Sequence, residues 1–263
     1  MTHVAGAVPG VSALVIAQDA GAQIDRCVAS LSFADEIVVV DGGSVDDTAG
    51  RARARGARVI ANPWPGFAAQ RRFALQQARH AWVFACDADE EVTAELATAI
   101  RRVVDGNTGA AGYRVHRRNQ FLGAWVDRGP WTDDWQLRLA RRDAVRVTDA
   151  AVHEGYLVNG PVAKLDPPLN HYTHPTIAES VRRMSVYTSL EAPGRARRRR
   201  VGVLDPLVAP AGVFFNYYVL KGCWRAGVRG YLLAATTAMY KSVLYVKTRA
   251  LQDPSAQDGR ASR

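Results

Sequence analysis

The chain has 263 residues, of which 48% are hydrophobic and 22% are charged, a composition that excludes an intrinsically disordered protein. Its cysteines, Cys27, Cys86 and Cys223, are scattered and form neither a disulfide framework nor a Cys-x-x-Cys metal site, which favours a reducing cytosol. The net charge of +9 is uneven: from residue 180 onward 15 bases face 4 acids, which is +11, and residues 1–179 carry −2. Such a basic C-terminal third indicates an anionic partner, either a membrane surface or nucleic acid.

The first ninety or so residues alternate predicted strands with predicted helices. Short apolar runs typical of buried strands cover 11–16, 36–41, 58–60 and 81–86, and helical spacing covers 24–31, 44–55 and 67–79. Ser44 and Asp47 resemble a capping box at the start of the second of these helices. The alternation predicts an α/β fold with a parallel sheet and helices on both faces.

A helix is expected over 93–104, and the segments 112–117 and 135–140 alternate apolar and polar residues as half-buried strands do. Gln136 and Arg138 project to one side of the second of these strands. They either line an acceptor pocket or form the exposed face of an edge strand. The loop between the two strands is rich in glycine and aromatic residues, among them Trp131. It is either a packed surface loop or a platform for a sugar ring.

The C-terminal third begins with a predicted helix over 175–191, which an arginine run over 195–200 follows. Two strongly apolar segments, 201–220 and 231–246, come next. Prolines and charged residues interrupt both, and a membrane-spanning helix needs about 20 clean apolar residues. Apolar segments with interspersed Lys and Arg favour amphipathic helices that lie in a membrane interface.

An acidic cluster directly follows the strand predicted over 81–86. α/β sheets bind ligands beyond the carboxyl ends of their strands, so Asp87 and Asp89 lie where a ligand is expected. Residues i and i+2 of an extended chain point the same way, and two such carboxylates can share a divalent cation that also holds phosphate oxygens. The alternative is that these acids only cap the helix that starts near Thr93.

Five segments in order resemble glycosyltransferase family 2, in particular the branch typified by the lipopolysaccharide core β-glucosyltransferases. The segments are Ala34–Thr48, Pro63–Gln70, Cys86–Glu91, Trp135–Leu139 and Val152–Glu154. The likeness runs from Val11 to Tyr172, and more loosely to Tyr245. It implies a GT-A fold, which is Rossmann-like with a mostly parallel central sheet, and an inverting transferase that uses a nucleotide-diphosphate sugar.

The domain organisation implied is a catalytic domain over 1–174, followed by a basic, helical, membrane-associating region over 175–263. Within the catalytic domain the nucleotide-sugar half covers about 11–92 and the acceptor half about 93–174.

The resemblance also implies roles for individual residues. Asp41 is expected to contact the nucleobase, and Asp89 and Asp87 to hold a metal together with the ribose and diphosphate of the donor. Two positions depart from the family pattern: Gln18-Asp19-Ala20 stands where an Asn-Glu pair is usual, and Arg72 stands where Asn is usual. The further residues expected to bind the nucleotide sugar are Ala17, Asp19, Gly43, Gln70, Arg71 and Ala88.

Sugar transfer breaks the bond to a diphosphate, on which negative charge builds. A divalent cation, Mg²⁺ or Mn²⁺, stabilises such charge, and Arg71 either adds a second positive contact or lies on a solvated helix face. Inversion in one displacement needs a base. Glu154 is the first candidate, Asp134 the second and Asp133 the third. His153 is a metal ligand, a diphosphate contact or a packed residue.

The leading hypothesis is a transferase that moves a hexose, with UDP-glucose the donor suggested, to a lipid-linked acceptor such as lipopolysaccharide core. We expect it to be cytoplasmic and peripheral on the cytoplasmic face of the inner membrane, since no secretory signal is evident. Another cell-envelope glycan is the alternative acceptor. The rival classes are a nucleic-acid-binding protein and a non-catalytic scaffold of transferase fold. His171, Tyr172 and His174 form either a packed junction or, less favoured, part of a zinc site.

Overall fold

The structure is a computed structural model that describes residues 8–106, 109–129, 131–148, 155–173 and 175–253. It divides into two compact units. The first unit comprises residues 1–118 and 133–172, and the second comprises residues 119–132 and 173–263. The loop that carries Trp131 therefore belongs to the same unit as the C-terminal helices.

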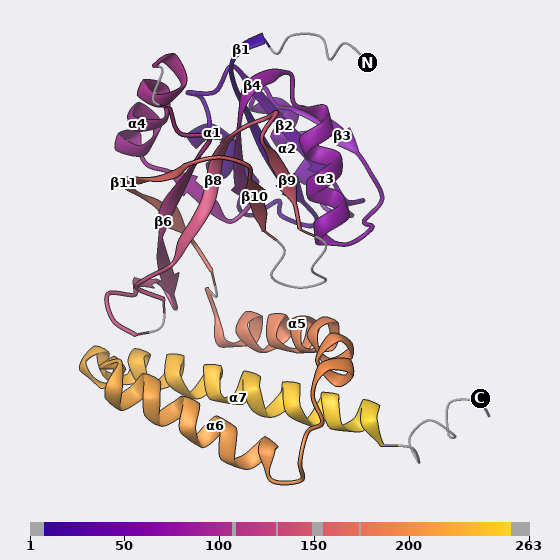
Figure 1. Ribbon diagram of the computed structural model, residues 1–263, viewed down its shortest axis with the longest axis vertical. Coiled ribbons are helices and arrows are strands. Elements are labelled where there is room, and N and C mark those ends of the chain that lie inside the picture. Colours follow the sequence, from indigo (N-terminus) through magenta and orange to yellow (C-terminus); the bar gives the residue numbers. More distant parts are fainter. Residues whose placement is uncertain (1–7, 107–108, 130, 149–154, 174, 254–263) are drawn as a thin grey trace, which may run out of the picture. The chain divides into compact units, whose positions relative to one another are not determined.

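A mixed sheet forms the centre of the first unit, with strand order β3-β2-β1-β4-β8-β6-β11-β5 (Figure 1). Pairing is parallel from β3 to β4, and antiparallel where β8 meets β4 and β6 and where β5 meets β11. The α/β class is confirmed, and the parallel pairs lie in the N-terminal part of the chain. The strands of the sheet are β1 (Val8–Ala17), β2 (Glu36–Asp41), β3 (Arg58–Ala61), β4 (His80–Asp87), β5 (Glu90–Val92), β6 (Gly112–Phe121), β8 (Trp135–Arg141) and β11 (Val162–His171). Three short strands complete the set: β7 (Ala124–Trp125), which pairs with β6, and β9 (Val145–Val147) with β10 (Tyr156–Val158), which pair with each other.

Helices cover both faces of this sheet, as expected. Side chains of a strand alternate between faces, and alternate residues of β1 enter different core clusters. Val11, Ala13 and Val15 pack in one cluster with residues of helices α1 (Ile24–Ser30), α2 (Thr48–Ala54) and α4 (Ala94–Asp105). Leu14 and Ile16 pack in the other with residues of α3 (Phe67–Gln77). Burial on both faces explains why the parallel strands are continuous apolar runs.

Two helix starts differ from the sequence interpretations. The hydroxyl of Thr93 accepts the backbone N–H of Leu96 and caps α4, so Asp87 and Asp89 do not cap that helix. The capping box expected at Ser44 is wrong, because α2 begins only at Thr48 after Asp47. The Ser44 hydroxyl instead donates to the carboxylate of Asp41.

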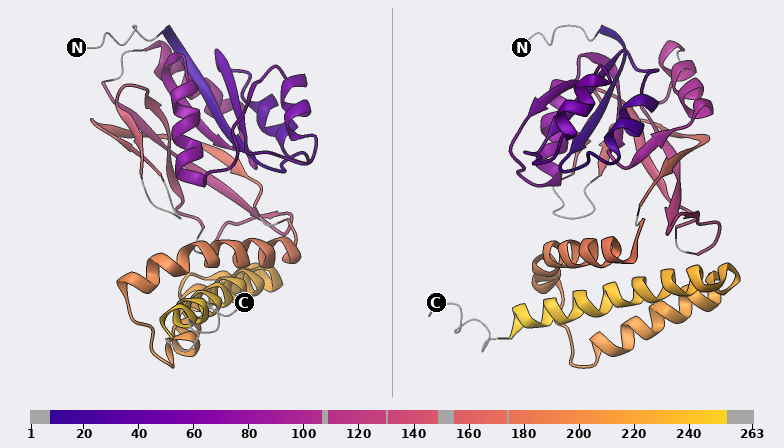
Figure 2. Two further views of the ribbon diagram at one scale, coloured as in Figure 1. Left: turned by 90° about the vertical axis from the view of Figure 1, so that its right-hand side faces the viewer. Right: turned by 180° about the vertical axis from the view of Figure 1, so that it is seen from behind.

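The second unit contains α5 (Ile177–Arg198), α6 (Asp205–Phe215), a π-helical turn (Asn216–Leu220), a 3₁₀ turn (Cys223–Ala226) and α7 (Gly227–Gln252). Helix α7 packs against both α5 and α6 (Figure 2). Among the helices described, none combines the length and the apolar character needed to cross a membrane.

Helix α5 runs further than the expected 175–191 and takes in part of the arginine run. Two contacts from α7 explain this. The side-chain amide of Gln252 donates to the carbonyls of Ala196 and Arg199 at 2.9 and 2.7 Å. The guanidinium of Arg195 lies 4.5 Å from the ring centroid of Tyr245. Packing against α7 therefore orders a segment that charge repulsion alone would disfavour.

Candidate active site

Acidic residues end β2 and β4, the two strands that flank β1, at the same edge of the sheet. Asp41 ends β2 and pairs with Ala17 of β1, and Asp87 ends β4 and pairs with Ile16 of β1. Because β1 lies between β2 and β4, the two acids are one strand apart. This carboxyl edge is where α/β sheets bind ligands.

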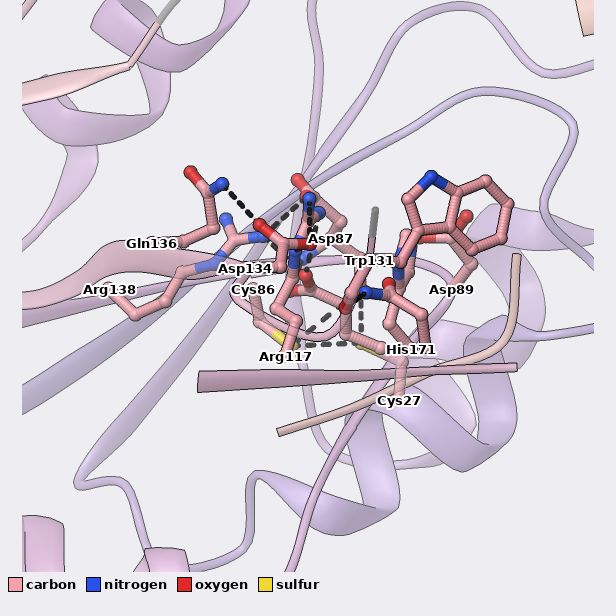
Figure 3. Close-up of polar contacts among 12 residues, drawn as sticks. Cys27, Cys86, Asp87, Asp89, Arg117, Trp131, Asp134, Gln136, Arg138 and His171 are labelled. Atoms are coloured by element: carbon pink, nitrogen blue, oxygen red, sulfur yellow. Dashed lines mark hydrogen bonds and ion pairs between the residues drawn. The ribbon is translucent and has the colours of Figure 1, made fainter. Parts of the chain in front are cut away.

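Asp87 is held between two arginines that come from different elements. Nη2 of Arg71, on α3, lies 2.7 Å from one carboxylate oxygen. Nη2 of Arg138, on β8, lies 2.7 Å from the other (Figure 3). Burial by itself raises the pKa of Asp87, but the two guanidinium groups outweigh it and hold that pKa well below its usual range. Arg71 is only 12% exposed, so its interpretation as a solvated helix residue is wrong.

Glu90 is a fully buried member of this cluster that sequence analysis did not single out. Its carboxylate pairs with Arg138, lies 3.5 Å from Nη1 of Arg117, and accepts the backbone N–H of Asp87 at 2.9 Å. Burial raises the pKa of Glu90 despite the attraction of Arg138. The only signal in the sequence was its place in the acidic run 87–91, where it resembles a solvent-exposed acid.

Asp89 does not share an extended segment with Asp87, since β4 ends at Asp87 and residues 88–89 form a turn. The argument that the two carboxylates point the same way because they are i and i+2 is therefore wrong. Oδ1 of Asp89 lies 3.5 Å from Nε2 of His171 on β11, and the Asp89 carbonyl accepts the N–H of Tyr172 at 2.9 Å.

The donor set suits a hard cation only if a ligand completes it. Among the described residues no three His, Cys, Asp or Glu side chains come together as a metal centre. Mg²⁺ and similar cations are commonly held by one or two carboxylates plus substrate phosphates. Asp89 fits this arrangement, whereas the Asp87 carboxylate already has two cationic partners. A zinc site that includes His171 would need further ligands close to it, and the part of the chain that the structure describes brings no such group together.

A second group of expected donor-binding residues lies in the loops after β1 and β2. The Ser44 hydroxyl accepts the N–H of Asp19 at 2.9 Å, and the Asp19 carboxylate accepts the N–H of Val45 at 2.8 Å. The Ala17 carbonyl accepts the N–H of Gly42 at 2.8 Å. Asp19 and Gly43 have φ of 50° and 94°, in the left-handed region. These contacts fix both loops next to Asp41.

Gln70, another expected donor contact, is fully buried on α3. Its side-chain oxygen accepts from Nδ2 of Asn62 at 2.7 Å, and its amide donates to the Asn62 carbonyl at 3.2 Å. This pair fixes the loop between β3 and α3. A donor contact by Gln70 stays a prediction.

The acids proposed as alternative bases stand at the start of β8. Asp134 accepts from Arg117 at 2.8 Å and from Nε2 of Gln136 at 2.6 Å. Arg117 thus lies between Asp134 and the buried Glu90. β8 is flanked by β4 and β6, so the interpretation of Gln136 and Arg138 as the exposed face of an edge strand is wrong. Asp133 is exposed at the preceding position.

Three further sequence predictions are not tested by these contacts. Glu154 and His153 lie outside the described residues. Trp131 lies in the second unit, where its ring is 5.8 Å from that of Phe121 and its carbonyl accepts from Nδ2 of Asn119. That packing accounts for the order of its loop, and a role in sugar binding stays a prediction.

A pair of buried thiols lies under the strand end. Sγ of Cys27, on α1, is 3.9 Å from Sγ of Cys86 and 3.4 Å from the carbonyl of Asp87 (Figure 3). The hydrogen bond from Cys27 and burial raise the pKa of Cys86, which keeps it protonated and unreactive. The cysteines are free, consistent with the absence of a disulfide framework.

Comparison with known proteins gives the family. Residues 12–155 match the model of "Glycosyl transferase family 2". The chain is 30% identical over 237 residues to the lipopolysaccharide core biosynthesis glycosyltransferase LpsC of Rhizobium meliloti, covering 87% of this chain and 88% of LpsC. It is 27% identical to an uncharacterized glycosyltransferase of Rickettsia felis over 69% of each chain. The protein belongs to glycosyl transferase family 2, and the resemblance noted in the sequence is confirmed.

Solved structures show a partial likeness. The crystal structure of glucosyl-3-phosphoglycerate synthase from Mycobacterium tuberculosis in complex with Mg²⁺ and uridine diphosphate aligns with a TM-score of 0.46 and 19% identity, over 72% of this chain and 78% of that one. The family assignment depends on the sequence matches, not on this likeness.

Proposed function

We propose that the protein is an inverting, metal-dependent glycosyltransferase that moves a hexose from a UDP-sugar to a lipid-linked acceptor of the lipopolysaccharide core type. The observation that carries this proposal is the cluster of Asp87, Arg71 and Arg138 beside Asp89 at the carboxyl edge of the sheet. The acceptor class follows from the name of the relative LpsC, and the UDP donor follows from the family resemblance. Another lipid-linked glycan is the alternative acceptor.

A divalent cation bound with the donor would supply charge stabilisation at the leaving diphosphate. Asp89 is the residue proposed to hold it, because it lies in the turn directly after β4, at the carboxyl edge of the sheet, where its carboxylate is 3.5 Å from the imidazole of His171. Asp87 is proposed to contact the donor while the two arginines keep it ionised. Arg71, at the rim of this cluster, is placed to add positive charge toward the diphosphate.

The acceptor hydroxyl must lose a proton as the new glycosidic bond forms. Glu154 remains the first candidate for this base. Asp134 already accepts hydrogen bonds from Arg117 and Gln136, which occupy lone pairs that a proton would need. That engagement supports placing Glu154 ahead of Asp134 as the candidate base, and Asp133 stays the third candidate.

The basic C-terminal region is proposed to attract the protein to the anionic cytoplasmic face of the inner membrane, where a lipid-linked acceptor would be reached. Residues 180–263 carry a net charge of +11. Each Lys or Arg close to an anionic surface contributes roughly 1 kcal/mol. A peripheral association of the protein with the membrane would then be enough for the catalytic unit to reach its acceptor.

The test is calorimetric titration of UDP and UDP-sugars into the purified protein, with and without Mn²⁺ or Mg²⁺. Metal-dependent binding that Asp89→Ala abolishes would support the proposed site. Asp105→Ala is the matched control, since Asp105 is an exposed acid at the end of α4 that pairs with Arg101. Absence of binding by the folded wild-type protein, or equal binding by Asp89→Ala, would contradict the proposal.

A further inference from the structure

The second unit exposes an apolar face that begins at Leu204, the residue before α6, and continues along α6 and the π-helical turn that follows it. Six of its large apolar side chains are between 43% and 71% exposed. We call this face the α6 stripe, and it consists of Leu204, Leu207, Val208, Phe215, Val219 and Leu220. Their spacing of three or four residues, with Ala211 between them, places them along one side of the helix. Soluble proteins rarely leave such a contiguous apolar face in water.

The opposite side of α6 is firmly packed on α7, so the stripe is not the result of a loose helix (Figure 2). The ring of Phe214 is 5.7 Å from that of Tyr231, and the ring of Tyr218 is 6.0 Å from it. The hydroxyl of Ser242 donates to the carbonyl of Pro206 at 3.1 Å. These contacts fix which side of α6 faces outward within this unit.

Charge is arranged around the stripe rather than on it. Residues 206–220 carry no charged side chain, and Asp205 is the only acid between residues 192 and 252. The arginine run 197–200 precedes the stripe, and Lys221, Arg225 and Arg229, all exposed, follow it. Trp224 is 52% exposed, with the Arg225 guanidinium 5.1 Å from its ring.

This pattern selects a lipid surface over a protein partner. An apolar helix face bordered by Lys, Arg and Trp matches the boundary between acyl chains and anionic headgroups. A second copy of the chain would bring two surfaces of the same positive charge together, which is unfavourable. A segment of 11 helical residues plus a five-residue turn is also too short to cross a bilayer, so it would lie in the plane.

We infer that the α6 stripe inserts into the acyl-chain boundary of an anionic membrane leaflet and lies parallel to it. This goes beyond the charge attraction proposed above: the basic residues bring the protein to the surface, and the stripe enters it. The biological purpose of the insertion, access to a lipid-linked acceptor, rests on the proposed function, whereas the insertion itself does not.

The first test places an environment-sensitive fluorophore on the stripe of the full chain through Leu207→Cys. The native cysteines are fully buried and do not compete for the label. We expect a blue shift on adding phosphatidylcholine vesicles that contain phosphatidylglycerol, and quenching by lipids brominated on the acyl chain. The same label at Val162→Cys, a 44% exposed site on β11, should show neither effect. A bound protein whose Leu207 label neither shifts nor quenches would overturn the inference.

The second test removes apolar surface without changing charge. The double variant Leu207→Gln with Phe215→Gln should bind these vesicles on the order of tenfold to a hundredfold more weakly. The control, Leu157→Gln with Val162→Gln, replaces two exposed apolar residues of the first unit, which are 47% and 44% exposed, and should bind as wild type does. Equal vesicle binding by both variants would refute insertion. Insertion would also be refuted if the wild type formed a dimer that the stripe variant does not form and that added vesicles do not dissociate.

Titration with UDP separates this inference from the proposed function. The stripe variant should bind UDP as the wild type does, because the stripe contains no donor-site residue. A protein that inserts into vesicles but binds no UDP would retain the inference and lose the proposed function.

Discussion

Arg138→Met removes the cation that the structure places between the half-buried carboxylate of Asp87 and the fully buried carboxylate of Glu90. Arg138 is 6% exposed and pairs with both Asp87 and Glu90. The two carboxylates in turn stabilise the charged form of Arg138. They raise the pKa of its guanidinium group, although burial alone would lower that pKa. Methionine is similar in length and apolar, so the change removes charge with little loss of volume.

Removing one partner of a buried ion pair costs about 3–5 kcal/mol. Here Arg71 still lies 2.7 Å from Asp87, and Arg117 lies 3.5 Å from Glu90. We therefore expect the lower end, about 3 kcal/mol of unfolding free energy at pH 7. Glu90 is the carboxylate left with the weaker partner, and its already raised pKa should rise further.

That shift gives the prediction a pH signature. A carboxyl whose folded-state pKa lies above its unfolded value favours the folded state below the unfolded pKa, and this contribution is lost as the pH rises through the folded pKa. The stability deficit of Arg138→Met should therefore shrink between pH 7 and pH 5. Adding Glu90→Gln to the variant should recover part of the deficit at pH 7.

Urea unfolding followed by tryptophan fluorescence measures both effects. Arg141→Met is the matched control on the same strand, because Arg141 is 50% exposed and pairs with an exposed Asp143. It should cost no more than about 0.5 kcal/mol. A deficit for Arg138→Met no larger than that of the control, or one that does not change with pH, would refute the reasoning.

Three other perturbations follow from the structure. Phe84→Ala should lower the unfolding free energy by about 3–5 kcal/mol in urea titrations, since Phe84 is fully buried and packs edge-on against Phe33; a loss below 1 kcal/mol would argue against that burial. Arg182 and the neighbouring Arg183 lower the pKa of Glu179 to about 2. The contribution of Glu179 to the free energy of unfolding should therefore be present above pH 4.5 and disappear as the pH falls toward 2. Glu179→Gln should remove this acid dependence from unfolding curves measured at several pH values. Glu154→Gln should lower kcat on the order of 100- to 10,000-fold while UDP affinity is kept, and unchanged turnover would reassign the base.

The strands and the position of the acids could be predicted because their causes are local. A strand buried on both faces must be a continuous apolar run, and the polar residue that ends it must lie at the sheet edge. Hence the runs ending at Asp41 and Asp87 identified both the sheet and the edge at which a ligand is expected. The apolar stretch 201–220 and the basic residues around it were likewise visible in the sequence.

Which charges meet was beyond the sequence, since those pairs join residues far apart in the chain. Arg138 reaches Asp87 across a separation of 51 residues, and the pair forms only because β8 inserts antiparallel beside β4. Glu90, which a local pattern assigns to the surface, is fully buried on β5, where it pairs with Arg138 and lies beside β11. The turn at residues 88–89 turns Asp89 away from the extended course assumed for it. The sequence by itself determined most of the N-terminal strands and helices and the edge of the sheet at which a ligand is expected, because apolar periodicity is a local property. The tertiary structure alone decided the ion pairs and the protonation of the acids there, because both depend on burial and on partners brought in from distant strands.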